Sequence, residues 1–215
     1  MFLSDDDFIM TFAIPTVYPI TDRKLSALSH AEQVARLIDG GATLIQLRDK
    51  ESSPRAFLTE AKAALRIARD HNVKLIINDR VDIAMALDAD GVHLGQSDLP
   101  PDNARLILKP GSIIGLSTHN LPQVRLARTF PVDYVALGPI FSTASKFDHE
   151  PPLGLEQLTE AKRVLGNIPL VAIGGITRAK VRDVLNAGAD SVAIISALIS
   201  HSAEITQNTR KFLSL

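Results

Sequence analysis

The chain has 215 residues, 46% of them hydrophobic, a formal net charge of −1 and no cysteine, so a disordered chain, a disulfide scaffold and a thiolate metal site are excluded. Lysine and arginine are spread along the sequence rather than gathered in a basic stripe, which argues against a nucleic-acid partner. The first ten residues are acidic, unlike a signal peptide, and no apolar run reaches the length of a membrane span, which favours a cytoplasmic protein with no membrane partner.

Short apolar runs alternate along the chain with segments of helical periodicity. The runs predicted to form strands are residues 13–20, 43–48, 74–78, 91–94, 112–116, 134–137, 170–173 and 191–195. The segments predicted to form helices are residues 28–38, 54–69, 81–87, 101–108, 121–129, 155–165, 178–187 and 197 onward.

This alternation predicts parallel strands joined by crossover helices. Eight strands with short connections favour an α/β (β/α)8 TIM barrel over an open doubly wound sheet, and the glycine-rich turn of a dinucleotide-binding fold does not follow the first strand. No linker or change of composition divides the chain. We therefore expect a single domain, residues 13–215, preceded by an N-terminal leader, residues 1–12.

In such barrels the chemistry lies at the carboxyl ends of the strands. The second predicted strand ends with Gln46 and Arg48, followed by Lys50. Side chains alternate along a strand, and Ile45 and Leu47 are expected to pack against the helices. Gln46 and Arg48 are therefore predicted to point toward the barrel mouth.

Two aspartates follow neighbouring predicted strands, Asp79 after the third and Asp98 after the fourth. Adjacent strands lie about 4.8 Å apart, so the two carboxylates could share one ion. Magnesium takes one or two protein carboxylates together with substrate phosphate oxygens. Either aspartate alone is better explained as a helix cap or turn residue. The pair, beside the cations Arg48, Lys50 and Lys146, predicts one Mg²⁺ site.

The sixth predicted strand continues into a loop that carries Thr143, Ser145 and Lys146. Small hydroxyl donors beside a cation suit a phosphate or diphosphate, although a solvated surface loop would have the same composition. Residues 140–152 form a longer connection than is usual between a barrel strand and its helix. We expect this connection to close over the diphosphate as a lid.

A second anion site is predicted after the seventh and eighth strands, where phosphate commonly binds in this fold. Gly174 and Gly175 allow the backbone to approach a ligand closely, and Ile195 and Ser196 precede the last helix. The alternative is that the glycines only permit the turn.

The histidines are less informative than the carboxylates and cations. His119 is the stronger candidate for a role at the mouth, whereas His93 is expected to pack or to cap. His30, His71 and His201 fall on helices or at their ends and are expected to face solvent.

Six segments of the chain, in order and at the expected spacing, closely resemble the thiamine phosphate synthase family. They are residues 46–50 (QLRDK), 77–80 (INDR), 91–98 (GVHLGQSD), 115–119 (GLSTH), 138–146 (GPIFSTASK) and 172–176 (AIGGI). The resemblance runs from about residue 18 to residue 198.

The resemblance implies a magnesium-assisted transferase that condenses hydroxymethylpyrimidine diphosphate with hydroxyethyl-methylthiazole phosphate. The products are thiamine phosphate and pyrophosphate, so the expected partners are small phosphorylated molecules. Arg48, Lys50 and Lys146 match the diphosphate-binding residues of the family, and Asp79 and Asp98 match its magnesium ligands.

The remaining matches concern the two substrates. Gln46, Asn78 and Ser117 match residues around the pyrimidine and the leaving diphosphate, and the expected catalytic residues are Lys146, Ser117 and Arg48. The residues expected at the thiazole phosphate are Thr143, Ser145, Gly175, Ile195 and Ser196.

Three serines depart from the pattern of the family. Ser145 stands where threonine is expected, Ser97 where glutamate is commoner, and Ser191 where glycine is usual. None of these departures removes a charge that the reaction needs.

Two other functions fit the same barrel. A related thiazole tautomerase would use His119 as a proton shuttle and would need no metal-bound diphosphate. A non-catalytic, ligand-binding regulator would be expected to keep the phosphate loop and lose the metal carboxylates. Because Asp79, Asp98, Arg48 and Lys146 are all retained, the synthase is favoured. The sequence leaves the oligomeric state open, a homo-oligomer included.

Overall fold

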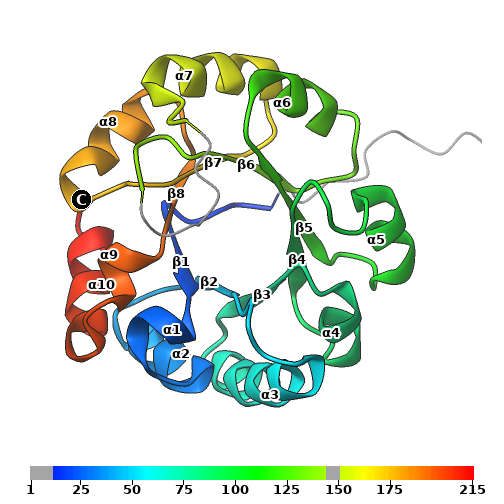
Figure 1. The fold of residues 1–215 in the computed structure, drawn as a ribbon, viewed down its shortest axis with the longest axis vertical. Helices are drawn as coiled ribbons and strands as arrows, with labels where there is room; N and C mark the ends of the chain where they lie inside the picture. Colours follow the sequence, from blue (N-terminus) through cyan, green and yellow to red (C-terminus); the bar gives the residue numbers. More distant parts are fainter. Residues whose placement is uncertain (1–11, 144–150) are drawn as a thin grey trace, which may run out of the picture.

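Each apolar run forms a short strand, and the strands pair in chain order into a closed parallel barrel (Figure 1). The computed structural model describes residues 12–143 and 151–215. β8 pairs with β1 and closes the ring, so the predicted α/β (β/α)8 TIM barrel is confirmed. The strands are β1 (Val17–Thr21), β2 (Leu44–Leu47), β3 (Lys74–Asn78), β4 (Gly91–Leu94), β5 (Ile113–Thr118), β6 (Tyr134–Leu137), β7 (Leu170–Ile173) and β8 (Ser191–Ile194).

Helices surround the barrel and begin where the sequence supplies suitable caps. Ser29 and Glu32 form a capping box at the start of α2, and Ser53 caps α3, which begins with Pro54. The helices are α1 (Arg23–Ser26), α2 (His30–Asp39), α3 (Pro54–Asp70), α4 (Val81–Ala86), α5 (Pro101–Ile107), α6 (Leu121–Ala127), α7 (Gly154–Leu165), η1 (Arg178–Lys180), α8 (Val181–Asn186), α9 (Ser196–Ile199), η2 (Ser202–Glu204) and α10 (Ile205–Leu213).

The structure corrects three of the predicted boundaries. The first strand begins at Val17 rather than at residue 13. Of the preceding residues, Thr16 O accepts the backbone N–H of Val192 in β8 at 2.9 Å, and Phe12 and Ile14 pack against the barrel interior. The helix expected over residues 178–187 starts with the 3-10 turn η1. The closing helix is divided into α9, η2 and α10. Of the expected leader, only Phe12 lies within the described residues.

Strand side chains divide into two layers because they alternate along each strand. Ile45, Leu47 and their counterparts on the other strands pack against the helices in a continuous apolar shell. The opposite set fills the barrel interior, and it includes two tyrosines, Tyr18 and Tyr134. The interior is thus packed and partly polar, where branched aliphatic residues usually dominate.

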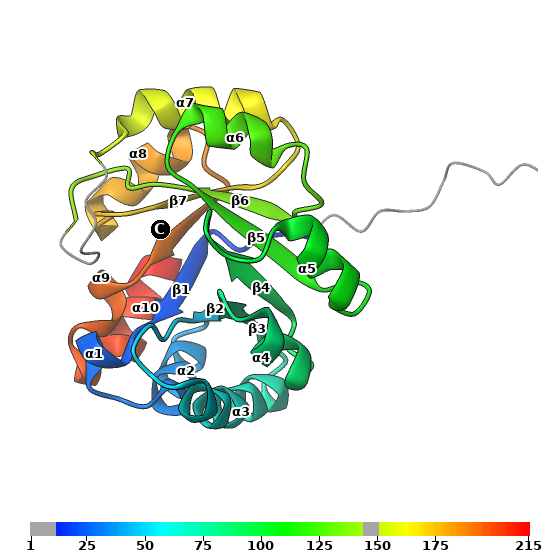
Figure 2. The same cartoon turned by 45° about the vertical axis from the view of Figure 1, so that its right-hand side comes forward.

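The last helices return to the first ones. Figure 2 shows α9 and α10 beside α1 and α2, and direct contacts of α10 with α2 and of α9 with α1 agree with this view. Within the described ranges, the structure contains no helix with the length and apolar character needed to cross a membrane.

Candidate active site

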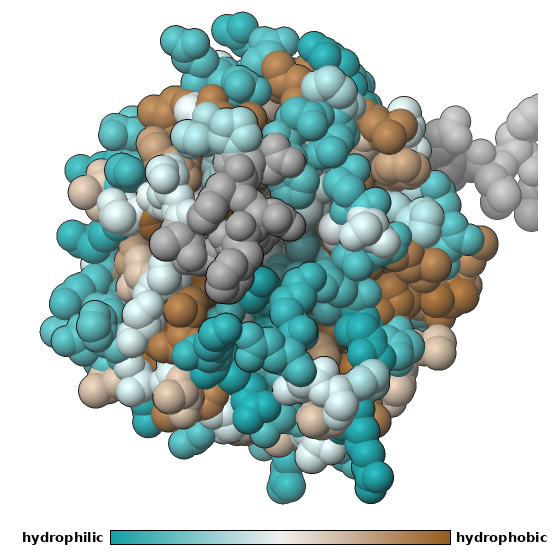
Figure 3. Space-filling model, in the orientation of Figure 1, coloured by the Kyte–Doolittle hydropathy of each residue, from teal (hydrophilic) through white to brown (hydrophobic). Residues whose placement is uncertain are grey.

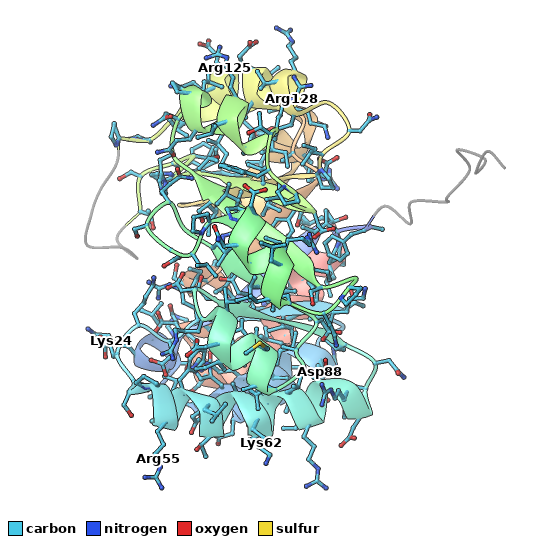
Figure 4. All side chains as sticks on the ribbon, turned by 90° about the vertical axis from the view of Figure 1, so that its right-hand side faces the viewer. Lys24, Arg55, Lys62, Asp88, Arg125 and Arg128 are labelled. Carbon is cyan, nitrogen blue, oxygen red and sulfur yellow. The ribbon has the colours of Figure 1, made fainter. Side chains whose placement is uncertain are left out.

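Hydrophilic residues border the centre of the carboxyl end of the barrel, which faces the viewer in Figure 3. Charged side chains of the outer helices, among them Arg55 and Lys62 on α3 and Arg125 on α6, instead point away from the barrel (Figure 4). A ligand in the mouth would therefore meet the charged residues that follow the strands, as is usual in this fold.

Asp79 follows β3 and Asp98 lies in the loop after β4, and their carboxylates interact. Burial raises the pKa of Asp98, the backbone amide of Gly95 opposes that shift, and the Asp79 carboxylate adds to it. The ammonium group of Lys50 contacts Asp79 Oδ2. Asp79 has a φ of 61°, a left-handed conformation that aspartate and asparagine adopt more readily than most residues.

This pair of carboxylates fits a divalent cation. Two like charges held close together in a partly buried place repel each other, and a bound cation would balance them. Within residues 12–143 and 151–215, no group of three or more His, Cys, Asp or Glu side chains is arranged around a metal position. A magnesium ion at Asp79 and Asp98 would therefore complete its shell with oxygens of substrate and water, which is its usual preference.

Arg48 leaves the end of β2 and is held by Asp22, which follows β1. Asp22 Oδ1 accepts the backbone N–H of Lys24 at 2.9 Å and so caps α1, while its Oδ2 accepts from Arg48 Nη1 at 2.9 Å. A cavity of about 540 Å³ opens here, and both Arg48 and Lys50 line it. Asp22 thus fixes one cation at the edge of a hollow large enough for a phosphorylated ligand.

A chain of hydrogen bonds runs from the barrel interior to Ser117, near the end of β5. Gln46 Nε2 donates to Tyr18 Oη at 3.1 Å, and Tyr18 Oη lies 3.0 Å from Tyr134 Oη. His93 joins Tyr134 Oη to Ser117 Oγ, with its Nδ1 2.9 Å from the phenol and its Nε2 2.8 Å from the hydroxyl. Gln46 is therefore part of the interior rather than of the open mouth.

Two further polar residues lie in this part of the mouth: Asn78, which the sequence predicted, and Gln96, which it did not. Asn78, the last residue of β3, is buried with 8% of its surface exposed, next to Asp79 in the chain. Gln96 Nε2 donates to the backbone oxygen of Ser117 at 2.6 Å, which ties the β4 loop to the end of β5. The residues predicted around the pyrimidine, Gln46, Asn78 and Ser117, therefore lie on β2, β3 and β5.

The loops after β6 and β7 are joined by their backbones. Phe141 N donates to Gly174 O at 3.0 Å, and a Cβ added at Gly175 would lie 2.4 Å from Ser142 O. Gly175 has a φ of 64°, so glycine is needed there for conformation as well as for space. This contact brings the segment that carries Thr143 against the predicted second anion site.

Two other residues of the predicted second anion site lie directly after β8. Ser196 is exposed at the start of α9, and Ile195 precedes it. Ser145, Lys146 and most of the expected lid, residues 140–152, lie outside the described residues.

The histidines differ from expectation in two places. His30 was predicted to face solvent, and this is wrong: it is fully buried, because Thr21 Oγ1 at 2.8 Å and Asp49 Oδ2 at 3.4 Å satisfy its ring nitrogens. Burial lowers the pKa of His30, and the Asp49 carboxylate opposes that shift. His93 packs, as expected, in a stack on Tyr134, but it also contacts Ser117 directly.

His119 is oriented by the loop after β6. Its Nδ1 donates to the backbone oxygen of Gly138 at 2.9 Å, because a carbonyl can only accept. The sequence-based interpretation missed Asp22, Tyr18 and Tyr134 as partners of the site. The parity of the two tyrosines on their strands was the available signal, since both fall on interior positions.

Comparison with known proteins gives a consistent result. The model of the thiamine monophosphate synthase family matches residues 17–198. A thiamine-phosphate synthase of Koribacter versatilis is 43% identical over 209 residues, which cover 94% of this chain and 96% of that protein. A thiamine-phosphate synthase of Albidiferax ferrireducens is 45% identical over 183 residues, with coverage of 85% and 83%. The solved structure of a thiamine phosphate pyrophosphorylase from Pyrococcus furiosus matches with a TM-score of 0.82 at 35% identity, covering 93% of this chain and 94% of that one.

Proposed function

Because the chain belongs to the thiamine monophosphate synthase family, we propose that it is the transferase of thiamine biosynthesis that joins hydroxymethylpyrimidine diphosphate to hydroxyethyl-methylthiazole phosphate. The products are thiamine phosphate and pyrophosphate. The observation that carries the proposal for the site itself is the interacting pair Asp79 and Asp98, with Lys50 against it and Arg48 nearby.

In this proposal the residues after β2 to β5 hold the leaving diphosphate. Arg48 and Lys50 supply positive charge, with Lys146 as a third cation, and the Ser117 hydroxyl donates a hydrogen bond. When the bond to the pyrimidine methylene breaks, negative charge grows on the diphosphate, and preorganised donors stabilise it. Arg48, Lys146 and Ser117 are therefore proposed as the catalytic residues.

Asp79 and Asp98 are proposed to hold Mg²⁺ for this diphosphate. When bound, the ion would neutralise part of the charge that develops on the leaving group. Lys50 contacts Asp79, and this position supports its proposed role at the same phosphates. Gln46, in the barrel interior below the mouth, and Asn78, at the end of β3, are proposed to surround the pyrimidine.

The thiazole phosphate is assigned to the opposite side of the mouth. Its proposed ligands come from the loops after β6, β7 and β8. They are Thr143, Ser145, Gly175, Ile195 and Ser196. The backbone bond between Phe141 and Gly174 supports this assignment, since it joins two of the three loops. A cytoplasmic location also remains part of the proposal.

The two alternative functions are less well supported. None of the three proteins compared above is named as a tautomerase or as a regulator. A tautomerase would also have no use for the carboxylate pair Asp79 and Asp98.

One assay tests the proposal directly. The purified protein is mixed with both substrates and Mg²⁺, and thiamine phosphate and pyrophosphate are measured together. We expect equimolar products that disappear with EDTA and return with added Mg²⁺. Absence of thiamine phosphate at saturating substrates and Mg²⁺ would refute the synthase function.

A further inference from the structure

The polar chain inside the barrel has a direction that can be derived from its donors and acceptors. Gln46 Nε2 is a donor, so Tyr18 Oη accepts from it and can give its own hydrogen to Tyr134 Oη, 3.0 Å away. Tyr134 then gives its hydrogen to His93 Nδ1 at 2.9 Å. With Nδ1 as acceptor, neutral His93 carries its proton on Nε2 and donates to Ser117 Oγ at 2.8 Å.

Burial in the barrel interior keeps the phenols of Tyr18 and Tyr134 protonated, so that both can donate a hydrogen bond. Tyr18 and Tyr134 are completely buried, and burial raises the pKa of each above the ordinary value for tyrosine, so both retain their protons. A buried hydroxyl without a partner is costly, so each donor in such a chain has a strong preference for the acceptor next to it. The direction set at Gln46 therefore extends to Ser117.

The backbone of β5 makes room for this arrangement. A Cβ added at Gly115 would lie 2.1 Å from Tyr134 Cζ, so only glycine at this position admits the phenol to the interior. The Tyr134 ring is stacked on the His93 ring, with centroids 5.5 Å apart and an interplanar angle of 20°. Tyr134 thus fixes both the ring position and the hydrogen bonding of His93.

We propose that Tyr18, Tyr134 and His93 are positioning residues that make Ser117 Oγ an acceptor on its inner side, so that its own hydrogen points into the mouth as a donor. An anion in the mouth, such as the leaving diphosphate, then meets a hydroxyl that is already turned toward it. This inference rests on the proposed function only for its kinetic consequence. The direction of the hydrogen bonds from Gln46 to Ser117 is a property of the ligand-free protein.

The test compares Tyr134→Phe with a matched control, Phe12→Leu. Tyr134→Phe keeps the ring on His93 and removes only the donor to Nδ1. Phe12→Leu alters a different neighbour of the Tyr134 ring, since the Phe12 centroid lies 6.2 Å from that of Tyr134. It leaves the hydrogen bonds from Gln46 to Ser117 intact. His93 ring nitrogens are followed by 15N NMR of the ligand-free protein and are assigned with His93→Gln.

In the wild type and in Phe12→Leu, His93 is expected as the Nε2–H tautomer with Nδ1 unprotonated. In Tyr134→Phe the Nδ1 signal should shift and the Nδ1–H tautomer should appear. The kcat should fall roughly 10- to 100-fold, as when the partner that orients a ligand group is removed, while the KM for the thiazole phosphate stays unchanged. A purely structural role of the phenol would lower the melting temperature without moving the tautomer.

Three results would overturn the inference: an Nδ1–H tautomer in the wild type, an unchanged tautomer and kcat in Tyr134→Phe, or equal kinetic losses in Tyr134→Phe and Phe12→Leu. If the wild type makes no thiamine phosphate, the proposed function fails, yet the NMR comparison still decides the direction of the chain. The two failures are therefore distinguishable.

Discussion

Aspartates lie at both ends of the barrel, in very different surroundings. At the amino end, Asp90, Asp133 and Asp190 directly precede or adjoin the starts of β4, β6 and β8. Each accepts a backbone N–H from the strand before it in the sequence. The bonds run from Leu75 N to Asp90 at 2.8 Å, from Ile114 N to Asp133 at 2.7 Å and from Leu170 N to Asp190 at 2.7 Å.

The backbone completes each of these contacts in the reverse direction. The N–H of each aspartate donates to the carbonyl of the same partner residue. Arg105 adds a bond to Asp133 at 2.7 Å, and Lys162 adds one to Asp190 at 2.7 Å. The same clamp therefore joins β3 to β4, β5 to β6 and β7 to β8.

At the carboxyl end, Asp79 interacts with the Asp98 carboxylate and with the ammonium group of Lys50, and Asp98 accepts the backbone N–H of Gly95 in its own loop. The two carboxylates repel each other and Lys50 offsets part of that repulsion, whereas the clamps at the amino end join strands and stabilise the fold. The groups around a carboxylate, rather than the carboxylate itself, therefore distinguish a structural aspartate from a ligand-binding one.

The largest expected effect comes from Asp79→Asn at the carboxyl end. Asparagine tolerates the left-handed backbone of this position, so the fold should be retained. We expect kcat to fall about 10²- to 10³-fold, because one charge that stabilises the leaving group through the metal is lost. Steady-state rates over a Mg²⁺ titration measure this loss, and extra Mg²⁺ should restore part of it.

Thermal unfolding of the same variant tests whether Asp79 is a structural residue. Asp79→Asn removes the repulsion from Asp98 and also the ion pair with the half-exposed Lys50, so the ligand-free melting temperature should change little. Normal turnover of Asp79→Asn at low Mg²⁺ would contradict the metal assignment, and a strongly lowered melting temperature would make Asp79 a structural residue.

The next effect is expected at the amino end and is one of stability. Asp133→Ala removes the acceptor for Ile114 N–H and leaves Arg105 without its carboxylate. We expect the free energy of unfolding to fall by about 1–3 kcal/mol, while kcat per folded molecule stays within about twofold. Urea unfolding and active-site-normalised rates provide the two measurements.

Asp88→Asn is the matched control for this experiment, because Asp88 has a φ of 52° and asparagine tolerates this left-handed conformation. Asp88 lies near the same end of the barrel in Figure 4, and it forms ion pairs with Lys109 and Arg69 on the exposed surface. Exposed pairs contribute little, so no measurable change is expected. Equal losses in Asp88→Asn and Asp133→Ala would show that the clamp adds nothing beyond a surface charge.

Features of the fold and of the site that depend on local sequence pattern were predicted correctly. Alternating periods gave the eight strands, and the positions of Asp79 and Asp98 after neighbouring strands predicted that their carboxylates would meet. The contact between Tyr18 and Tyr134 spans 116 residues and crosses the barrel, so it depends on the closure and register of the whole ring. The prediction for His30 was wrong because its place on a helix does not show that Thr21 and Asp49 lie within hydrogen-bond distance of its buried ring.

A smaller effect should appear when the pH is lowered, and it arises at the carboxyl end. The pKa of His30 is lowered in the folded state, so the unfolded chain binds a proton more readily. The stability contributed by neutral His30 is complete above about pH 6.5 and is lost as the pH falls below that value. Urea unfolding at pH 8 and pH 5.5 should show this loss in the wild type. His30→Gln, which lacks the titrating ring, should show less of it, and an equal pH dependence would contradict the assignment.

The smallest effect is expected from Ser191→Ala, beside the clamp at Asp190. Ser191 Oγ is buried and has no hydrogen-bond partner within the described residues, whereas the buried Thr118 Oγ1, at the other end of the barrel, donates to Ala136 O at 2.9 Å. Removal of an unsatisfied hydroxyl should raise the free energy of unfolding by up to about 1 kcal/mol, and Thr118→Val should lower it by about that amount. Chemical unfolding measures the free energy of unfolding of both variants, and the two changes are predicted to have opposite signs. A loss of stability in Ser191→Ala would mean that its hydroxyl contributes to the clamp at the amino end after all.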